Sequence, residues 1–237
     1  MNFSTIHISE AGRKAPPRRI ENQDRVLCRE LPIGTAAGLL LVVADGISRC
    51  PSGGSVANWL VAKHLQEDIL DFSPQTEPAL VLKGYLESLK ARFSSEFAAP
   101  EYEGLLRSGC TLSVVLIQDQ QADCLWAGDS PIYHSRPVKK GFESRLLTRP
   151  DHDREGCLTN CFGAYSHFSL HHCRVQLEDA DIVTLVSDGI AVDEFTLGTI
   201  YKSNGFGSMA LQEMLRISRR GKFWDDLSIA AARVTAS

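Results

Sequence analysis

The sequence predicts an α+β fold in which antiparallel sheets are covered by helices. Strand-like runs are grouped into meanders, helix-like patterns occur in pairs between these groups, and no internal repeat or low-complexity linker divides the chain. The 237 residues, 43% of them hydrophobic, are enough to bury one large core. We therefore expect a single domain over residues 1–237.

The first half of the chain is expected to supply three strands and two helices. The strands are predicted at residues 3–8, 26–29 and 38–44. The helices are predicted at residues 55–70 and 78–97, where apolar residues recur at helical spacing. The third strand, GLLLVVA, is continuously apolar, which indicates burial on both faces. It ends on Asp45-Gly46 and so places an acid at its tip.

The second half is expected to form a strand meander, a flap, two helices and a last strand. The strands are predicted at residues 111–117, 122–126, 132–134, 171–177, 182–186 and 227–234, with a hairpin partner between Gly141 and Leu147. The helices are predicted at residues 192–202 and 208–219. Residues 149–167 are polar and contain glycine, which predicts a mobile flap.

The charge and the apolar stretches of the sequence argue against several kinds of partner and cellular location. The formal charge of −4 does not favour a nucleic-acid partner. The longest apolar stretch, residues 36–44, is far shorter than the roughly 20 residues that cross a bilayer, so no membrane span is expected. The first residues lack the apolar core of a secretory signal. We therefore expect a cytoplasmic protein.

The cysteine pattern favours free thiols. Seven cysteines form an odd set, mostly within apolar segments, which suits reduced thiols better than disulfides. The alternative is a zinc site, because Cys157 and Cys161 are followed by His171, His172 and Cys173. The irregular spacing makes buried thiols the preferred interpretation.

Three aspartates share an unusual position at the ends of apolar strands. Asp45 and Asp188 each close a strand and precede glycine, whereas Asp225 stands just before a strand. A carboxylate at the edge of a core is destabilising unless it is neutralised, and three converging carboxylates repel one another. A divalent cation would resolve both problems, and an all-oxygen ligand set favours Mg²⁺ or Mn²⁺.

Six short motifs that contain these acids occur in order along the chain. They are Arg19-Ile20-Glu21-Asn22-Gln23-Asp24, Val43-Ala44-Asp45-Gly46, Ser108-Gly109-Cys110-Thr111, Gly128-Asp129-Ser130, Leu185-Val186-Ser187-Asp188-Gly189 and Asp225-Asp226-Leu227-Ser228. Their order and spacing, from about residue 19 to residue 234, resemble those of the metal-dependent protein serine/threonine phosphatases, the PPM or type 2C phosphatases, in their minimal bacterial form. The resemblance implies a four-layer α-β-β-α sandwich, with two central antiparallel sheets flanked by helix pairs.

The resemblance also implies roles for individual residues. Asp45 would bridge two Mn²⁺ or Mg²⁺ ions, Asp188 and Asp225 would complete the shell of one, and the Gly46 carbonyl would bind the other. The remaining roles belong to two residues of the first motif. Arg19 would bind the substrate phosphate through its planar guanidinium, and Asp24 would hold a metal-bound water.

Three features depart from the pattern of that family, of which Pro131 after Ser130 and Gln23 before Asp24 are the least consequential. Leu106 stands where many members carry an aspartate for a third ion, so we expect that site to be absent or weak. The segment from Ile47 to Cys50 replaces the usual glycine-rich turn or histidine, so protonation of the leaving group would fall to a metal-bound water. Arg49 in this segment is either an extra substrate contact or a solvated loop residue.

The implied function is hydrolysis of phosphoserine and phosphothreonine in proteins. A metal-bridging hydroxide would attack directly, without a phosphoenzyme, and the enzyme, expected to be a monomer, would oppose a serine/threonine kinase by acting on the kinase or its targets. The alternative is a catalytically weak pseudophosphatase that binds phosphoproteins or a kinase. The intact Arg19, Asp45, Asp188 and Asp225 argue against it, whereas the altered loop after Gly46 keeps it open.

Overall fold

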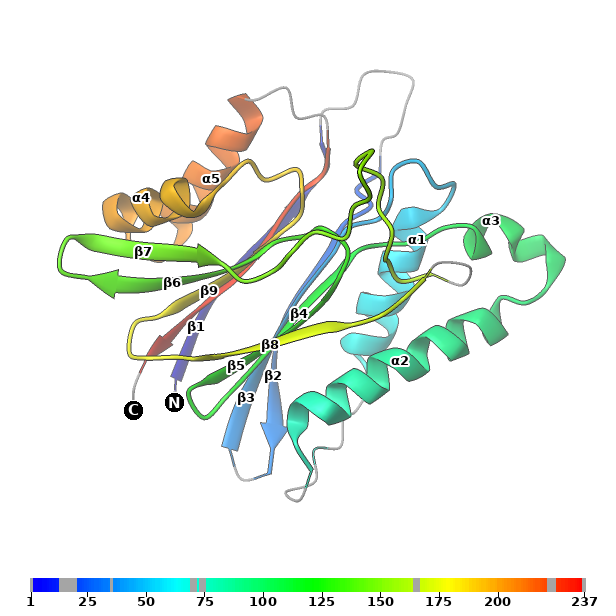
Figure 1. Cartoon of the computed structure of the whole chain (residues 1–237), viewed down its shortest axis with the longest axis horizontal. Helices are drawn as coiled ribbons and strands as arrows, with labels where there is room; N and C mark the ends of the chain where they lie inside the picture. Colours follow the sequence, from blue (N-terminus) through cyan, green and yellow to red (C-terminus); the bar gives the residue numbers. More distant parts are fainter. Residues whose placement is uncertain are drawn as a thin grey trace.

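Two five-stranded antiparallel sheets form the centre of the computed structural model (Figure 1). The structure describes residues 2–12, 21–34, 36–68, 72, 76–163, 167–220 and 225–235. Sheet A has the strand order β1-β10-β9-β6-β7, and sheet B has the order β2-β3-β4-β5-β8. The strands of sheet A are β1 (Asn2–Glu10), β6 (Ile132–Val138), β7 (Gly141–Leu146), β9 (Ile182–Val186) and β10 (Leu227–Thr235). Those of sheet B are β2 (Arg25–Ile33), β3 (Ala36–Ala44), β4 (Leu112–Gln118), β5 (Gln121–Ala127) and β8 (His171–Gln176).

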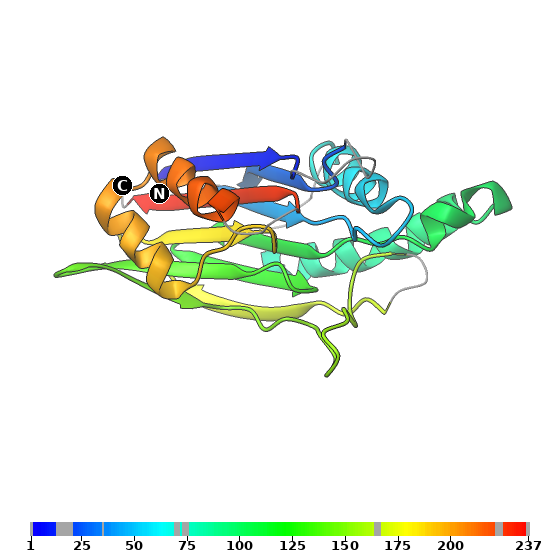
Figure 2. The same ribbon diagram turned by 90° about the horizontal axis from the view of Figure 1, so that it is seen from above.

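The helices divide between the outer faces of the two sheets (Figure 2). Sheet B is covered by α1 (Gly53–Asn58), which continues as the π-helix η1 (Trp59–Leu65), and by α2 (Pro78–Glu96). Sheet A is covered by α4 (Glu194–Asn204) and α5 (Ser208–Arg220). A third apolar cluster lies between the sheets. These four layers confirm the α-β-β-α sandwich that the sequence predicts.

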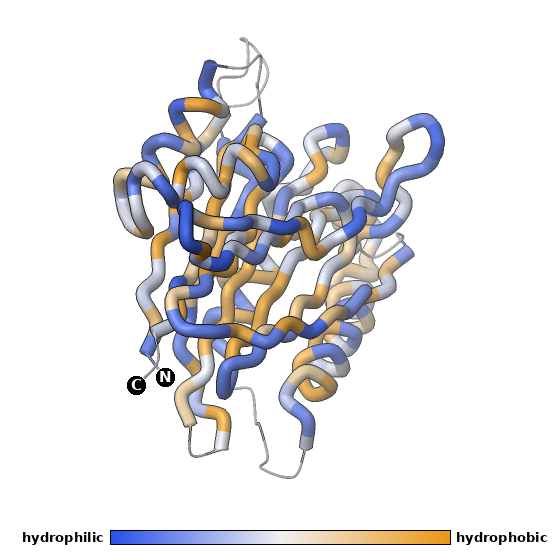
Figure 3. Tube along the Cα trace, turned by 60° about the vertical axis from the view of Figure 1, so that its left-hand side comes forward, coloured by the Kyte–Doolittle hydropathy of each residue, from blue (hydrophilic) through white to orange (hydrophobic). Residues whose placement is uncertain are grey.

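Both faces of strand β3 are buried, which explains why its sequence is continuously apolar. Its alternate residues enter different cores: Leu40 and Val42 pack toward the helices, whereas Leu41 and Val43 pack toward sheet A. All four side chains are buried. Figure 3 shows that hydrophobic residues run along the central strands. The strand is therefore held on both faces, which fixes the position of the acid that follows it.

The observed elements correct the sequence expectations at three places. Strand β2 is longer than residues 26–29, because it pairs with β3 along its whole length from Arg25 to Ile33. The first helix changes to π geometry at Trp59 and ends at Leu65 instead of residue 70. A short turn of helix, η2 (Pro100–Tyr102) followed by α3 (Glu103–Leu106), was not predicted.

The first and last strands pair with each other over nine residues each. Strand β1 is antiparallel to β10 from Asn2 opposite Thr235 to Glu10 opposite Leu227. The two ends of the chain consequently lie side by side (Figure 1). Within the described residues, no helix is long and apolar enough to span a membrane.

Candidate metal centre

Three of the predicted acids meet at one end of the sandwich. Asp45 follows β3 of sheet B, Asp188 follows β9 of sheet A, and Asp225 precedes β10. All three line one open cavity of ≈ 450 Å³. The ends of strands from both sheets thus bring together the three carboxylates that the sequence places next to apolar strands.

Asp45 is the most perturbed of these acids. Burial raises its pKa well above the usual value, and repulsion from Asp24, Asp188 and Asp225 raises it further. Its carboxyl also shares a hydrogen bond with Asp188, whose pKa is raised by its own burial. In the absence of a cation, burial and this repulsion therefore favour the neutral form of Asp45 over the ionised form.

Asp24 is deeply buried behind this group. Its side chain is 1% exposed, and neither carboxylate oxygen has a hydrogen-bond partner in good geometry. Burial raises its pKa to about 6, although nearby hydroxyls of Ser187 and Ser228 oppose the shift. A buried carboxylate without a bonded donor requires a compensating positive charge or a proton.

Gly46 is required by the close approach of two backbone segments. A Cβ atom at this position would lie 2.6 Å from the carbonyl carbon of Gly53 and 2.8 Å from Cβ of Gln23. Only glycine lets the turn after Asp45 pack against the start of α1. The Gly46 carbonyl is the predicted ligand of the second ion, and Gly46 itself is buried between cavity-lining residues Asp45 and Ile47.

Asp226 holds the strand ends around the cavity, a role that sequence reasoning missed. Its Oδ1 accepts a hydrogen bond of 2.8 Å from the Gly12 amide, and its Oδ2 accepts one of 2.8 Å from the Gln23 amide. The residue is 3% exposed. It therefore joins the end of β1 and the segment before β2 to the start of β10. Its adjacency to Asp225 in the sequence was the available signal.

Two hydroxyls support the backbone at Asp45. The Thr111 hydroxyl accepts a hydrogen bond of 3.2 Å from the Asp45 amide, and the Thr111 amide donates one of 2.8 Å to the Asp45 carbonyl. The Thr111 hydroxyl is in turn bonded to that of Ser130 at 2.6 Å. Thr111 and Ser130 belong to two different sequence motifs, and together they fix the tip of β3.

Asp129 and His152 form another part of the cavity wall. Both line the cavity, and the Asp129 Oδ2 is 2.7 Å from the His152 Nε2. Asp129 lies close enough to Asp188 to raise the pKa of that acid. Leu106, in contrast, is a buried residue of α3 and does not line the cavity. The expectation that a third ion site is absent or weak stays a prediction, and Asp129 is the acid of the cavity wall that lies close to Asp188.

The predicted flap forms the outer rim of the cavity. His152, Glu155 and Cys157 from this segment line it, together with Arg49 from the loop after Gly46. The flap is anchored by Asp151, whose Oδ2 accepts hydrogen bonds from the Gly128 amide at 2.9 Å and from Asn160 Nδ2 at 2.8 Å. Arg19, the predicted phosphate ligand, and residues 164–166 of the flap lie outside the described residues.

The donors at this end fit a hydrated divalent cation. They are carboxylate and carbonyl oxygens, which Mg²⁺ and Mn²⁺ prefer, and both the raised pKa values and the unbonded Asp24 oxygens indicate missing positive charge. Among the described residues, no three His, Cys, Asp or Glu side chains are close enough to hold an ion by themselves. Water would have to fill part of any coordination shell, as is usual for Mg²⁺.

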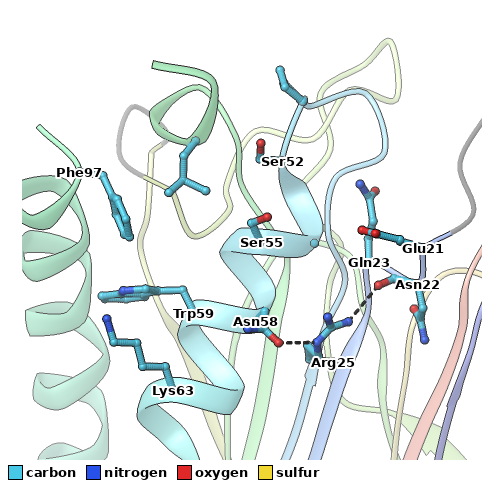
Figure 4. A pocket seen from close by; sticks show the side chains of 13 residues that line it. Glu21, Asn22, Gln23, Arg25, Ser52, Ser55, Asn58, Trp59, Lys63 and Phe97 are labelled. Atoms are coloured by element: carbon cyan, nitrogen blue, oxygen red, sulfur yellow. Dashed lines mark hydrogen bonds between the residues drawn. The ribbon is translucent and has the colours of Figure 1, made fainter. Parts of the chain in front are cut away.

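A second cavity of ≈ 480 Å³ lies beside the first, between the start of β2 and helix α1 (Figure 4). Its lining includes Arg25, Trp59 and Lys63, and Glu21 is the one acid among the lining residues that the structure describes. The Arg25 guanidinium donates to Asn58 Oδ1 at 2.9 Å, as the figure shows. Without clustered carboxylates, this cavity does not share the chemistry of the first.

The two histidines of the alternative zinc site are bonded to acids. His171 Nε2 is 2.8 Å from an Asp151 carboxylate oxygen, and His172 Nε2 is 2.8 Å from one of Asp123. All seven cysteines are free thiols. This part of the chain thus uses its imidazoles to fix strand and flap positions.

Comparison with solved structures gives close matches in fold. The S. agalactiae serine/threonine phosphatase matches with a TM-score of 0.79 and 19% identity over 98% of this chain and 100% of that one. PppA, described as a key regulatory component of T6SS in Pseudomonas aeruginosa, matches with a TM-score of 0.75 and 22% identity over 98% of each chain. The catalytic domain of the serine/threonine phosphatase PstP, in complex with two manganese ions, matches with a TM-score of 0.74 and 19% identity over 99% of each chain.

Sequence comparison identifies the family. A search of curated proteins gives no match. The family model described as Protein phosphatase 2C matches residues 11–225, which include most of the chain and five of the six motifs in full. The chain therefore belongs to the protein phosphatase 2C family and is a protein serine/threonine phosphatase by that membership.

Proposed function

We propose that this protein removes phosphate from phosphoserine and phosphothreonine in proteins with two Mn²⁺ or Mg²⁺ ions bound at the end of the sandwich. The supporting observation is the convergence of Asp45, Asp188 and Asp225 on one open cavity. Asp45 would bridge the ions, the other two carboxylates would bind one of them, and the Gly46 carbonyl would bind the second. When bound, such ions supply a hydroxide nucleophile at neutral pH and neutralise the phosphoryl oxygens, so that no phosphoenzyme is required.

The protein's own groups prepare this site in three ways. Asp24, which is buried behind the cluster, would in its ionised form accept a hydrogen bond from a metal-bound water. The bonds from Thr111 to the Asp45 backbone hold the bridging carboxylate in place. Arg19 would bind two phosphate oxygens through its guanidinium, which a lysine could not do with the same geometry.

The open cavity favours a substrate presented on a protein surface. Its rim is made by exposed loop residues, including Ser48 and Arg49, and not by a closed apolar pocket. We propose that a serine/threonine kinase, or the targets of one, supplies this substrate. Comparing the phosphorylation state of a partner kinase in cells with and without the phosphatase tests this part of the proposal.

The central experiment is hydrolysis of a phosphothreonine peptide with Mn²⁺, compared with an EDTA control. Phosphate release that requires the metal supports the proposal. Binding of the peptide without release, unaffected by EDTA, would instead support a pseudophosphatase. Arg19→Lys gives a separate test of the phosphate contact: its KM should rise by about tenfold, while Mn²⁺ binding measured by calorimetry should remain unchanged.

A further inference from the structure

Two cysteines stand directly opposite each other on neighbouring strands. Cys124 of β5 is the register partner of Cys173 of β8. Directly opposite residues of antiparallel strands point to the same face and have Cα atoms about 4.5–5.5 Å apart. A disulfide needs a Cα separation of about 4.4–6.8 Å. The Cα separation already meets that requirement. The Cβ atoms of directly opposite residues are about 4.5–5.5 Å apart and must approach to about 3.8 Å in a disulfide, so a small local movement of the strands accompanies its formation.

The two thiols are in contact and differ in exposure. Cys124 is fully buried between the sheets, and Cys173 packs against the same cluster from the edge strand β8, where it is half-buried. A hydrogen bond from Cys124 and the positive charge of Arg145 lower the pKa of Cys173, against the opposing effects of burial and of Asp123. The outer thiol is therefore the one more readily ionised, and the inner thiol is placed to meet it.

Other cysteines lack this combination. Burial raises the pKa of Cys28 to about 12, and it raises that of Cys110 well above the usual value. Cys157 is exposed, but it lies in the flap and has no cysteine opposite it in a strand pair. The pair on β5 and β8 is the place in the described structure where two thiols are fixed opposite each other by strand register.

We propose that Cys124 and Cys173 are a peroxide-sensitive modification site that forms a reversible cross-strand disulfide. The Cys173 thiolate attacks one oxygen of hydrogen peroxide, the O–O bond breaks, and the released hydroxide takes up the proton that Cys173 had lost. The resulting sulfenic acid is attacked by the sulfur of Cys124, and the S–O bond breaks. Water leaves with the Cys124 proton, so two thiols and one peroxide give one disulfide and two waters.

Strand β8 connects this pair to the catalytic cavity. Its first residue, His171, stacks on Trp126 with ring centroids 5.1 Å apart and bonds to Asp151 at 2.8 Å. Asp151 anchors the flap, and the next residue, His152, is bonded to Asp129 in the cavity wall. Strand β8 must follow Cys173 when that residue is drawn toward β5. The disulfide is therefore expected to shift the flap and slow hydrolysis, a consequence that rests on the proposed function.

Peptide mass mapping tests the chemistry without reference to activity. The metal-loaded protein is treated with hydrogen peroxide, remaining thiols are alkylated, and the digest is compared with and without dithiothreitol. We expect a Cys124–Cys173 cross-linked peptide, lighter by two hydrogen atoms than its parts and lost on reduction. Cys173→Ser should abolish it, and Cys28→Ser, which removes another half-buried strand cysteine, should not. Oxidation of the exposed Cys157 shows that the peroxide treatment was effective. If Cys124 and Cys173 are still reduced under that treatment, and are therefore recovered in alkylated form, the proposal is overturned.

A second variant tests whether loss of the cross-linked peptide in Cys173→Ser results from misfolding. In Cys124→Ala, the sulfenic acid of Cys173 should persist and be trapped by dimedone, whereas in the wild type it should not. Phosphatase activity is then followed in parallel. A severalfold decrease on oxidation that dithiothreitol reverses, and that is absent in Cys173→Ser, supports the connection through β8. A disulfide with unchanged activity overturns that connection, and absence of activity in the reduced protein overturns the proposed function alone.

Discussion

The carboxyl of Asp45 shares a hydrogen bond with the carboxylate of Asp188, and the two residues belong to different sheets. The bond therefore crosses the gap between the sheets at the end where the cavity opens. Burial and repulsion favour the neutral form of Asp45 at this position, whereas a cation binds the ionised carboxylate. Metal binding and proton release at this site are consequently linked.

Replacing Asp45, the proposed bridging acid, should raise the stability of the metal-free protein but lower its activity. Asp45→Asn removes a carboxylate that Asp24, Asp188 and Asp225 repel, so the EDTA-treated variant should unfold a few degrees higher than the wild type. Its activity should fall by about 100-fold or more, and Mn²⁺ should no longer raise its unfolding temperature. Asp119→Asn, at a β4–β5 turn residue with φ 46°, is the matched control. A variant with nearly normal turnover would exclude Asp45 from the metal site.

The stability of the metal-free protein should decrease as the pH rises. The pKa of Asp24 is raised from 3.8 to about 6 by burial, so the folded state binds more protons than the unfolded state between these values. Its stabilising contribution is complete below 3.8 and is lost as the pH passes 6, by about 3 kcal/mol. Thermal unfolding with EDTA from pH 4 to 7.5 measures this, and the raised pKa of Asp45 acts in the same direction.

Saturating Mn²⁺ is the control for this pH dependence. Only ionised carboxylates bind the cation, so the decrease with pH should disappear or reverse in its presence. If the unfolding temperature of the metal-free protein rises steadily from pH 4 to 7, the raised pKa of Asp24 is contradicted.

Gly189 should be intolerant of any side chain. A Cβ at this position would lie 2.1 Å from the Asp226 carbonyl oxygen, so Gly189→Ala must separate the end of β9 from the start of β10. Asp188 and Asp225 stand on these two segments, and Mn²⁺ affinity should fall by about tenfold or more. Titration calorimetry measures the loss.

Gly84 provides the matched control for this substitution. It lies within α2, and a Cβ there would meet no atom within 4 Å. Gly84→Ala should stabilise the helix by about 1 kcal/mol and leave Mn²⁺ affinity unchanged. Equal effects of the two substitutions would show that the contact with Asp226 is unimportant.

A buried ion-pair group in sheet A should affect stability but not catalysis. Asp181 is 0% exposed and accepts hydrogen bonds from His134 Nε2 at 2.8 Å and from Arg136 at 2.7 Å. Asp181→Ala leaves these donors without their acceptor and should lower the free energy of unfolding by about 3–5 kcal/mol. Chemical denaturation measures this loss, and kcat at a temperature where the variant is folded should equal that of the wild type. A reduced kcat would show that this group also acts on the catalytic cavity.

The sequence predicted the layers well because each element carries a strong local pattern. Strand β3 is apolar at every position from Gly38 onward since both of its faces are covered, and Pro78 begins α2 as expected. The change to π geometry at Trp59 was not predictable, because it depends on packing and not on a residue pattern. Strand β2 was underestimated since Pro32 interrupts its apolar pattern although the strand continues.

The convergence of the three acids on one cavity was predictable from the sequence, whereas the contacts that support them were not. Asp45, Asp188 and Asp225 stand next to apolar strands, so sequence position alone pointed to them. The interactions of Asp226 with Gly12 and of His152 with Asp129 join segments far apart in the chain. No local periodicity records such contacts.

The pairing of β1 with β10 has a consequence for the order in which the protein is made. Sheet A cannot be completed until the ribosome has synthesised residues 227–235, because β1 has no other strand partner along its length. Sheet B, in contrast, can form once β8 has emerged. Asp225 precedes β10, so the last of the three cavity acids arrives together with the strand that closes the fold. A nascent chain therefore holds Asp45 in place while it still lacks a complete site, and activity begins only after the last strand has been added.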